Sequence, residues 1–379
     1  MPSPLEVYFQ HFQLFVYFER LCLFKFMIKI LRKTHLTIAL LTSVFIVLLS
    51  LSGALLIFAP SLDKLLFSTQ WTVVPQGKIH NVAAMVSKVE LELAEKVSII
   101  EPGEFAEDVW RFRLQSGTYV NLDPYRLKIT KQYTFEQHIY GFTMLFHRWL
   151  LYQDEQGHRP MQDWVSITAL ALTINVLIGF YLWFKPKAPH KRLKIKRFSN
   201  RKIFYSQLHS VLGVFFCIPL LLIAVSGIAF NWKTPTQWLV QSLTGSQIET
   251  VPQVTYRDDG SENLPLALLV DKGQAALKQG VIYRIYLPSN DQPLRLRIKM
   301  PQESHAYSWV WVDPKSAQVL NTYNAQQSNL ATQVWHFKYK FHIGQFISPH
   351  MEWLWLIFSM SPILFLFTGL WLRLKRAKR

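Results

Sequence analysis

Cysteine and charge are both scarce in this 379-residue chain. It has two cysteines, Cys22 and Cys217, and only 17% of its residues are charged. Two distant cysteines exclude a disulfide framework, a cysteine-ligated zinc or iron–sulfur site, and the CxxCH attachment site of a c-type haem. Nucleotide-binding signatures are also missing, since no GxGxxG follows an expected strand and no Walker Gly-Lys-Ser/Thr occurs. A nucleotide or flavin domain is therefore not expected.

Acidic residues are few, and the charge is strongly basic. The chain has 41 Lys and Arg against 24 Asp and Glu, a formal net charge of +17. Such a charge normally indicates nucleic acid or an anionic membrane surface as a partner. Because half of the residues are apolar and 15% are aromatic, too few polar residues remain for the surface of a soluble nucleic-acid binder. We expect a membrane protein whose partner is the lipid bilayer, and no nucleic acid.

Four apolar stretches are each long enough to cross a bilayer, which takes about 20 residues. None of them contains Lys, Arg, Asp or Glu. Trp164, Trp183, Trp232 and Trp353 lie near their ends, as in the aromatic belts of membrane interfaces. The predicted transmembrane helices cover residues 36–60, 164–184, 203–232 and 353–372.

The basic residues predict the orientation of these helices. Residues 1–35, the linker 185–202 and the tail 373–379 together hold nineteen Lys and Arg but only two acids, so they carry the whole net charge. The loops 61–163 and 233–352 have no net charge. By the positive-inside rule, both termini and the linker are cytoplasmic and the two loops lie on the other side of the membrane.

The first 26 residues have two interpretations. They are rich in aromatic residues, but Glu19, Arg20 and Lys25 interrupt any span. They form either an interfacial helix or an over-extended start, because Met27 begins an ordinary basic lead-in to the first span. We favour the second interpretation, with the start at Met27.

The chain contains an internal duplication. His35 is followed 17 and 18 residues later by Ser52-Gly53, and His209 is followed at the same offsets by Ser226-Gly227. Each loop then has a helix-like segment, alternating strands and an Asp-Pro turn, at 123–124 and at 313–314. We predict a mainly α membrane protein, with four transmembrane helices in two repeats, each carrying a small α+β periplasmic module. Each module has a marginal core alone, so we expect the modules to pack on each other or on the membrane helices.

Four histidines lie at equivalent places in the two halves. The predicted orientation places His35 and His209 at the inner ends of spans one and three, and His147 and His342 at the outer ends of spans two and four. Two imidazoles that face each other can supply both axial nitrogens of a b-type haem. A single histidine at a membrane boundary is more often only interfacial, so spacing alone leaves both interpretations open. The alternative ligands at the outer site are His138, His336 and His350, and no catalytic residue is assigned.

Several segments together resemble the PepSY-associated transmembrane family of bacterial inner-membrane proteins. They are RKTHLTIALLTSVFIVLLSLSGALLIF, LHSVLGVFFCIPLLLIAVSGIAF, the two Asp-Pro modules, and FHIG followed by FTGLWLRLKR. The resemblance covers nearly the whole chain from about Lys29 and implies PepSY-like periplasmic modules. Members of this family are often linked to iron acquisition, and some are dihaem reductases of ferric siderophores.

The resemblance and the histidines together lead to one functional expectation. The protein would hold two haem b groups, with His35 and His209 as axial ligands of the inner haem iron and His147 and His342 as those of the outer one. Its substrate would be a ferric siderophore or another iron chelate, and its electron donor a quinol or another protein. The alternative is a haem-free PepSY membrane protein with a regulatory, binding or peptidase-inhibitory role.

Overall fold

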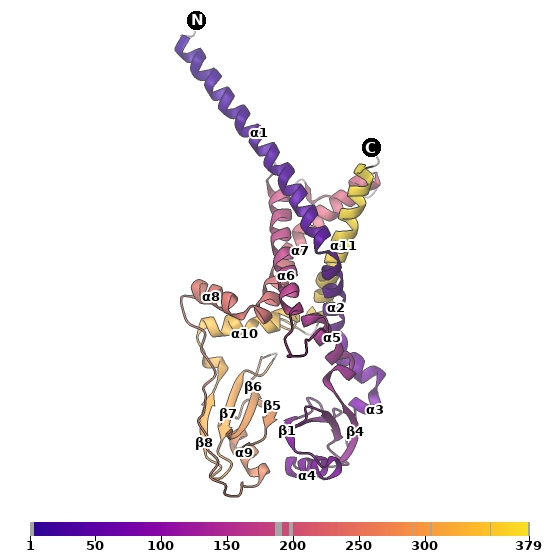
Figure 1. Ribbon diagram of the computed structural model, residues 1–379, viewed down its shortest axis with the longest axis vertical. Coiled ribbons are helices and arrows are strands. Elements are labelled where there is room, and N and C mark those ends of the chain that lie inside the picture. Colours follow the sequence, from indigo (N-terminus) through magenta and orange to yellow (C-terminus); the bar gives the residue numbers. More distant parts are fainter. Residues whose placement is uncertain are drawn as a thin grey trace. The chain divides into compact units, whose positions relative to one another are not determined.

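The computed structural model describes residues 4–185, 192–196, 200–289, 291–303, 305–348 and 350–377, with side chains from residue 23 to residue 375 (Figure 1). Half of the basic linker, residues 186–191 and 197–199, lies outside the described residues. The chain divides into two compact units. We call them the helical unit (Met1–Leu51, Asp163–Ile228 and Leu356–Arg379) and the sheet unit (Ser52–Gln162 and Ala229–Trp355).

Four helices are long and apolar enough to cross a membrane, as predicted. The first predicted span differs in detail, because a break at Thr42 divides it between two helices. Helix α1 therefore carries His35, and α2 carries Ser52 and Gly53. The long helices are α1 (Pro4–Leu41), α2 (Ser43–Leu66), α6 (Met161–Phe184), α7 (Arg201–Asn231) and α11 (Met351–Ala377).

The two loops have the same order of elements, two helices, four strands and a further helix. The first loop has α3 (Ser68–Trp71), α4 (Val82–Leu93), β1 (Val97–Glu101), β2 (Trp110–Leu114), β3 (Tyr119–Asp123), β4 (Lys128–Tyr133) and α5 (Ile139–Trp149). The second has α8 (Lys233–Thr244), α9 (Leu266–Ala276), β5 (Val281–Tyr286), β6 (Leu294–Lys299), β7 (Ser308–Val312), β8 (Val319–Tyr323) and α10 (Leu330–His342).

All eight strands form one antiparallel sheet, in the order β4-β3-β2-β1-β5-β6-β7-β8. The seam between the two loops is the pairing of β1 with β5, where Ile99 lies opposite Tyr286. Helices α4 and α9 cover one face of the sheet, and a single hydrophobic core fills the space between them and both halves (Figure 1). The sequence predicted that the modules pack on each other or on the membrane helices. Within the sheet unit, the modules pack on each other.

The two predicted Asp-Pro turns are present. The side chain of Asp123 accepts hydrogen bonds from the backbone N–H groups of Tyr125 and Arg126, at 2.8 and 3.1 Å. Asp313 accepts one from Lys315 at 2.8 Å. These are the local side-chain bonds that favour aspartate at the start of a turn.

The two outer histidines lie on helices of their own. His147 and His342 do not lie on the helices of spans two and four, but on α5 and α10, which precede them. The chain leaves α5 through two residues in the left-handed region, Leu150 and Leu151, and leaves α10 through Gly344 with φ +79°. These turns end each helix, because a left-handed residue stops the α-helical hydrogen-bond pattern.

Candidate functional site

The first histidine pair lies in the helical unit. The ring of His35 on α1 and the ring of His209 on α7 have centroids 6.2 Å apart and planes at 87°. The Nδ1 atom of His35 is 3.1 Å from the backbone carbonyl of Asn175 on α6. The Nδ1 atom of His209 is 2.8 Å from the hydroxyl of Thr368 on α11. Four helices, α1, α6, α7 and α11, thus take part in this site.

The hydrogen bonds of this pair determine where its protons lie. A carbonyl only accepts, so Nδ1 of His35 must donate to Asn175. The hydroxyl of Thr368 directs its hydrogen to the backbone carbonyls of Leu364 and Phe365, at 2.9 and 3.1 Å, and therefore accepts from Nδ1 of His209. Both rings are left with a lone pair on Nε2. This is the tautomer that ligates a metal, and the bond at the other nitrogen is the support that metal-bound histidines use.

The second pair lies in the sheet unit. The rings of His147 on α5 and His342 on α10 have centroids 6.3 Å apart. The Nδ1 atom of His147 is 2.9 Å from the hydroxyl of Ser52 on α2. The ring of Phe230 packs against His342, with centroids 5.3 Å apart. The structure thus brings together the two histidines of each predicted pair.

The spacing of both pairs fits two imidazoles on opposite sides of one metal ion. A metal–nitrogen bond is about 2.0–2.1 Å, and the ring centre lies about 1.2 Å beyond the nitrogen, so the centroids would be about 6.4 Å apart. The observed values are 6.2 and 6.3 Å. Among the described residues, no group of three or more His, Cys, Asp or Glu could hold a metal ion. A metal at either pair would thus take its other ligands from elsewhere, as a haem iron takes them from the porphyrin.

Two cations near the second pair have no carboxylate partner among the described residues. Arg148 follows His147, and its Nε atom is buried without a hydrogen-bond partner among the described residues. Lys338 lies one turn before His342 and donates to the backbone carbonyl of Trp335 at 3.1 Å. Burial, together with the charge of Lys233, lowers the pKa of Lys338 to about 7. A buried cation without an acid is costly, and a haem propionate would supply the missing negative charge.

The comparison with protein families agrees with this architecture. The model of the family described as PepSY-associated TM region matches residues 32–376, which include both histidine pairs and the whole sheet. The chain belongs to this family. No curated protein matches it. The family and the four apolar helices identify a membrane protein, and they leave its cofactors and substrate open.

Three glycines of this PepSY-associated protein make room for the histidine rings. A Cβ atom on Gly179 of α6 would lie 3.2 Å from Cε1 of His35, and one on Gly53 of α2 would lie 3.1 Å from Cε1 of His147. Gly369 of α11 is the nearest such position to His209, at 3.9 Å. The sequence shows that spans two and four end alike, at Gly179 and Gly369, but not that these glycines contact the histidines.

The alternative ligands of the PepSY-associated chain have other surroundings. His336 stacks on Tyr307, with centroids 4.1 Å apart and planes at 6°, and His350 is exposed. His138 is buried, and its Nδ1 atom is 3.0 Å from Oδ2 of Asp63. Burial lowers the pKa of His138, and the bond to Asp63 opposes that shift.

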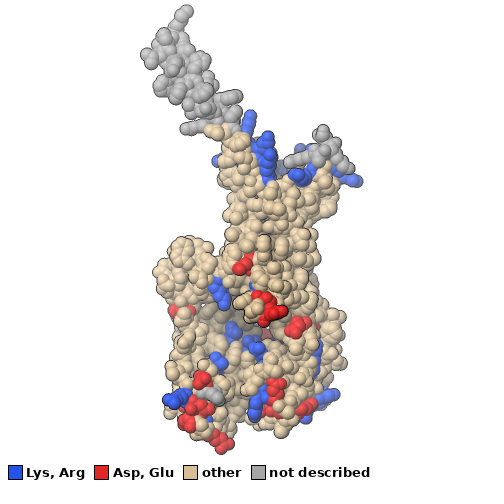
Figure 2. Space-filling model, viewed as in Figure 1, with Lys and Arg blue, Asp and Glu red and all other residues tan. Residues whose placement is uncertain are grey.

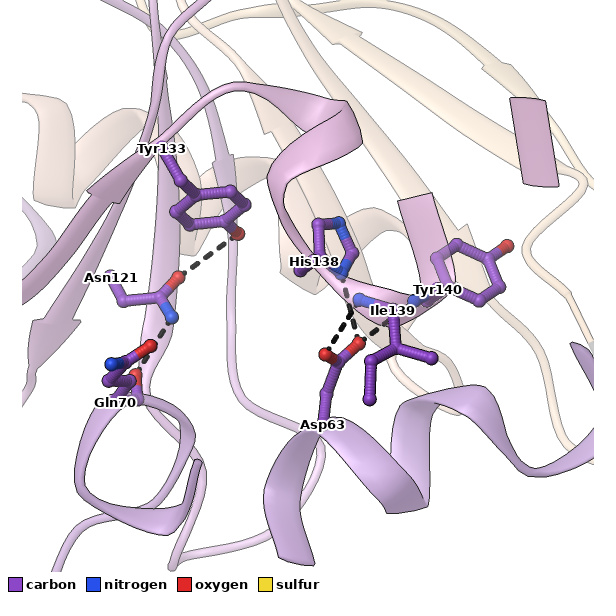
Figure 3. A network of polar contacts seen from close by, with 7 residues as sticks. All are labelled: Asp63, Gln70, Asn121, Tyr133, His138, Ile139 and Tyr140. Atoms are coloured by element: carbon purple, nitrogen blue, oxygen red, sulfur yellow. Dashed lines mark hydrogen bonds and ion pairs between the residues drawn. The ribbon is translucent and has the colours of Figure 1, made fainter. Parts of the chain in front are cut away.

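Sequence reasoning missed a contact that positions α5. Asp63, near the end of α2, accepts hydrogen bonds from the backbone N–H groups of Ile139 and Tyr140, at 2.9 and 3.1 Å (Figure 3). A carboxylate there satisfies N–H groups at the helix N-terminus that have no partner within the helix. Asp63 thus holds the start of α5 against α2, and the contact of His147 with Ser52 holds its end there. The signal available in the sequence was a lone acid directly after an apolar span.

Proposed function

We propose that this protein is a dihaem b-type reductase of the bacterial inner membrane, which passes electrons to a ferric siderophore in the periplasm and releases Fe(II). The observation that carries the proposal is the pair of ring separations, 6.2 and 6.3 Å, at four histidines that the sequence had already paired. Haem bound at each pair would supply a one-electron carrier. His35 and His209 would hold one haem, and His147 and His342 the other.

The Nδ1 bonds of these histidines would orient the rings. Asn175 and Thr368 hold His35 and His209 with Nε2 available for a ligand, and the hydroxyl of Ser52 lies 2.9 Å from Nδ1 of His147. Such bonds also raise the basicity of the ligating nitrogen. Arg148 and Lys338 would neutralise the propionates at the second site, because they are cations without carboxylate partners among the described residues.

The repeat would assign one pair to each side of the membrane. In α7, His209 and Ser226 are seventeen residues apart, a rise of about 26 Å. This is close to the thickness of the hydrocarbon core, about 30 Å. We propose Ser226 as the counterpart of Ser52, which contacts His147. The positive-inside rule would then put His35 and His209 on the cytoplasmic side, with both termini cytoplasmic and both loops periplasmic.

Reduction would release the iron because of the donors in the chelate. Hard oxygen ligands hold Fe(III) more tightly than the larger and less charged Fe(II), so one added electron weakens the complex. The donor would be a membrane quinol or another protein. A quinol that is oxidised to a quinone gives up two electrons and two protons, so its oxidation would reduce two ferric chelates.

The proposal predicts a haem spectrum that changes when the electron donor is added and again when the electron acceptor is added. Protein purified after expression with ample haem should show a Soret band and about two haems per chain. A quinol should reduce these haems, and a ferric chelate added without oxygen should reoxidise them while a ferrous-specific dye detects Fe(II). A protein without a Soret band under these conditions would refute the proposal and favour the haem-free alternative.

The glycines give a second, site-specific prediction. Leucine at Gly179 should displace His35 and reduce haem at the inner site, whereas leucine at Gly53 should displace His147 and reduce haem at the outer site, each by about half of the total. The matched control is Gly213→Leu on α7, because a Cβ atom at Gly213 meets nothing within 4 Å. Haem-to-protein ratios measure the effect. An equal loss in all three variants would show that the glycines do not make room for the ligands.

A further inference from the structure

The sheet has a second face, opposite the hydrophobic core, with an unusual composition. Side chains alternate between the faces of a strand, so β6 directs Leu294 and Leu296 to the core and Arg295 and Arg297 away from it. The strand registers extend this pattern across the sheet as two rows on the outward face. The first row is Lys131, Asn121, Arg111, Glu101, Arg284, Arg297 and Trp309, and the second is Tyr133, Tyr119, Arg113, Ile99, Tyr286, Arg295 and Trp311.

Positive charge dominates this outward face. Its two rows contain six basic residues but one acid, Glu101. Glu101 bonds Arg111 at 2.6 Å and also Arg284, so a single carboxylate already serves two guanidinium groups. The Nε atoms of Arg284 and Arg295 are buried and have no hydrogen-bond partner among the described residues. The face thus has spare donors for an anion.

Aromatic rings are interleaved with these cations. The guanidinium group of Arg295 lies 5.1 Å from the ring centre of Tyr286, and that of Arg297 lies 5.5 Å from Trp309. At one end of the face, Arg295, Trp309 and Trp311 line a cavity of about 580 Å³ together with Tyr256, whose hydroxyl is also buried and unpartnered among the described residues. Flat rings next to cations with spare hydrogen-bond donors suit a ligand that is both aromatic and anionic.

The outward face is connected to the outer histidine pair. Tyr339 of α10 lies one turn before His342, and Phe230 contacts both Tyr339 and His342, with centroids 6.2 and 5.3 Å away. Tyr339 also contacts His305 at 4.8 Å, and Arg297, Arg284 and Lys299 lie around His305. Burial and these three cations lower the pKa of His305 to about 3. Figure 2 shows Lys and Arg side chains in a hollow between the sheet and α10.

We propose that this face binds the substrate as a polyanionic, aryl-bearing ferric chelate of the tris-catecholate type. The arginines of β2, β5 and β6 would hold the negative charge of the complex, and the interleaved rings would pack on its aryl groups. The face would thus hold the iron complex near His342, so that one electron reduces Fe(III) to Fe(II). The role of this ligand as a substrate rests on the proposed function, whereas its binding to the face does not.

The test measures binding of two redox-inert gallium(III) complexes to the full-length protein in detergent by calorimetry. Gallium tris-catecholate carries three negative charges and three aryl rings, whereas gallium tris-acetohydroxamate is neutral and has no ring. We expect the catecholate complex to bind at least about tenfold more tightly. Its affinity should fall as salt rises from about 0.05 M to about 0.5 M. Equal affinities, or binding of tripolyphosphate as tight as that of the catecholate complex, would overturn the proposal.

Matched variants locate the binding. Arg297→Gln is expected to weaken binding of the catecholate complex about tenfold, whereas Lys272→Gln should leave it unchanged, because Lys272 lies on α9 at the opposite face. Arg113→Gln provides a variant in which folding is not at risk, since Arg113 is exposed, and it should weaken binding severalfold. Equal binding by all three variants would overturn the proposal. Gallium binding requires no haem, so a protein without a Soret band that still binds the catecholate complex would refute only the proposed reductase function.

Discussion

Alanine at His209 is expected to remove one of the two proposed haems and to leave the other in place, so that the haem-to-protein ratio falls by about half. The ring of His209 would supply one axial nitrogen at the inner site, and the remaining ring of His35 alone would give a five-coordinate iron that is held weakly. Alanine at His342 should remove the other haem, because His342 and His209 lie in different units of the structure. The double variant should contain almost none.

The controls for this experiment are histidines of the same chain. His336→Ala and His350→Ala should keep both haems, since His336 stacks on Tyr307 and His350 is exposed. Haem extraction with pyridine measures the ratio, and spectra of the reduced protein show which haem remains. Full haem content in both single variants, His209→Ala and His342→Ala, would show that the ligands are assigned wrongly. Loss in His336→Ala instead would favour the alternative ligand.

The sequence was sufficient for features that depend on residues within one segment or on the duplication. Four uncharged apolar stretches predicted four long helices, because a span has to satisfy its own backbone hydrogen bonds and cover them with apolar side chains. The pairing of His35 with His209 followed from their equal offsets to Ser52 and Ser226. The structure brings these two rings to 6.2 Å. Their role as haem ligands stays a prediction.

The features that the sequence could not give are contacts between distant segments. Nothing in Ile99 or Tyr286 marks them as the seam of one sheet, since any two edge strands of opposite direction could pair there. The separate helix of His147 was also missed, because its end at Leu150 and Leu151 uses left-handed residues that are not glycine. Leucine is rarely found in that conformation, so no local signal indicated the turn.

The basic and aromatic composition of the outward face could not be predicted from the sequence, although its strands could. The alternation of Arg295 and Arg297 with leucines predicted a strand with two different faces. The arginines alone gave no reason to expect more than a solvated surface. Their meaning depends on register, because Arg297 lies opposite Arg284 and Trp309 on its neighbouring strands. Only the pairing of all eight strands gathers these residues into one basic and aromatic surface.

Alanine at Asp63 is expected to destabilise the sheet unit by at least about 3 kcal/mol, because three buried donors lose their acceptor at about 1–3 kcal/mol each. The side chains of Asp63 and His138 are each 3% exposed. Without the carboxylate, the imidazole N–H of His138 and the backbone N–H groups of Ile139 and Tyr140 would lose their acceptor in a buried place. The thermal transition of the detergent-solubilised protein should fall accordingly.

The matched control is a second Asp–His pair with the same geometry on the surface. Asp154 and His158 are also 3.0 Å apart, but their side chains are 28% and 76% exposed. Water replaces the lost bond there, so Asp154→Ala should change stability by less than about 1 kcal/mol. Asp63→Ala should in addition lower haem at the outer site, because it frees the end of α5 that precedes His147, and leave the inner site filled. Equal thermal transitions for the two variants would mean that Asp63 does not hold the start of α5 against α2.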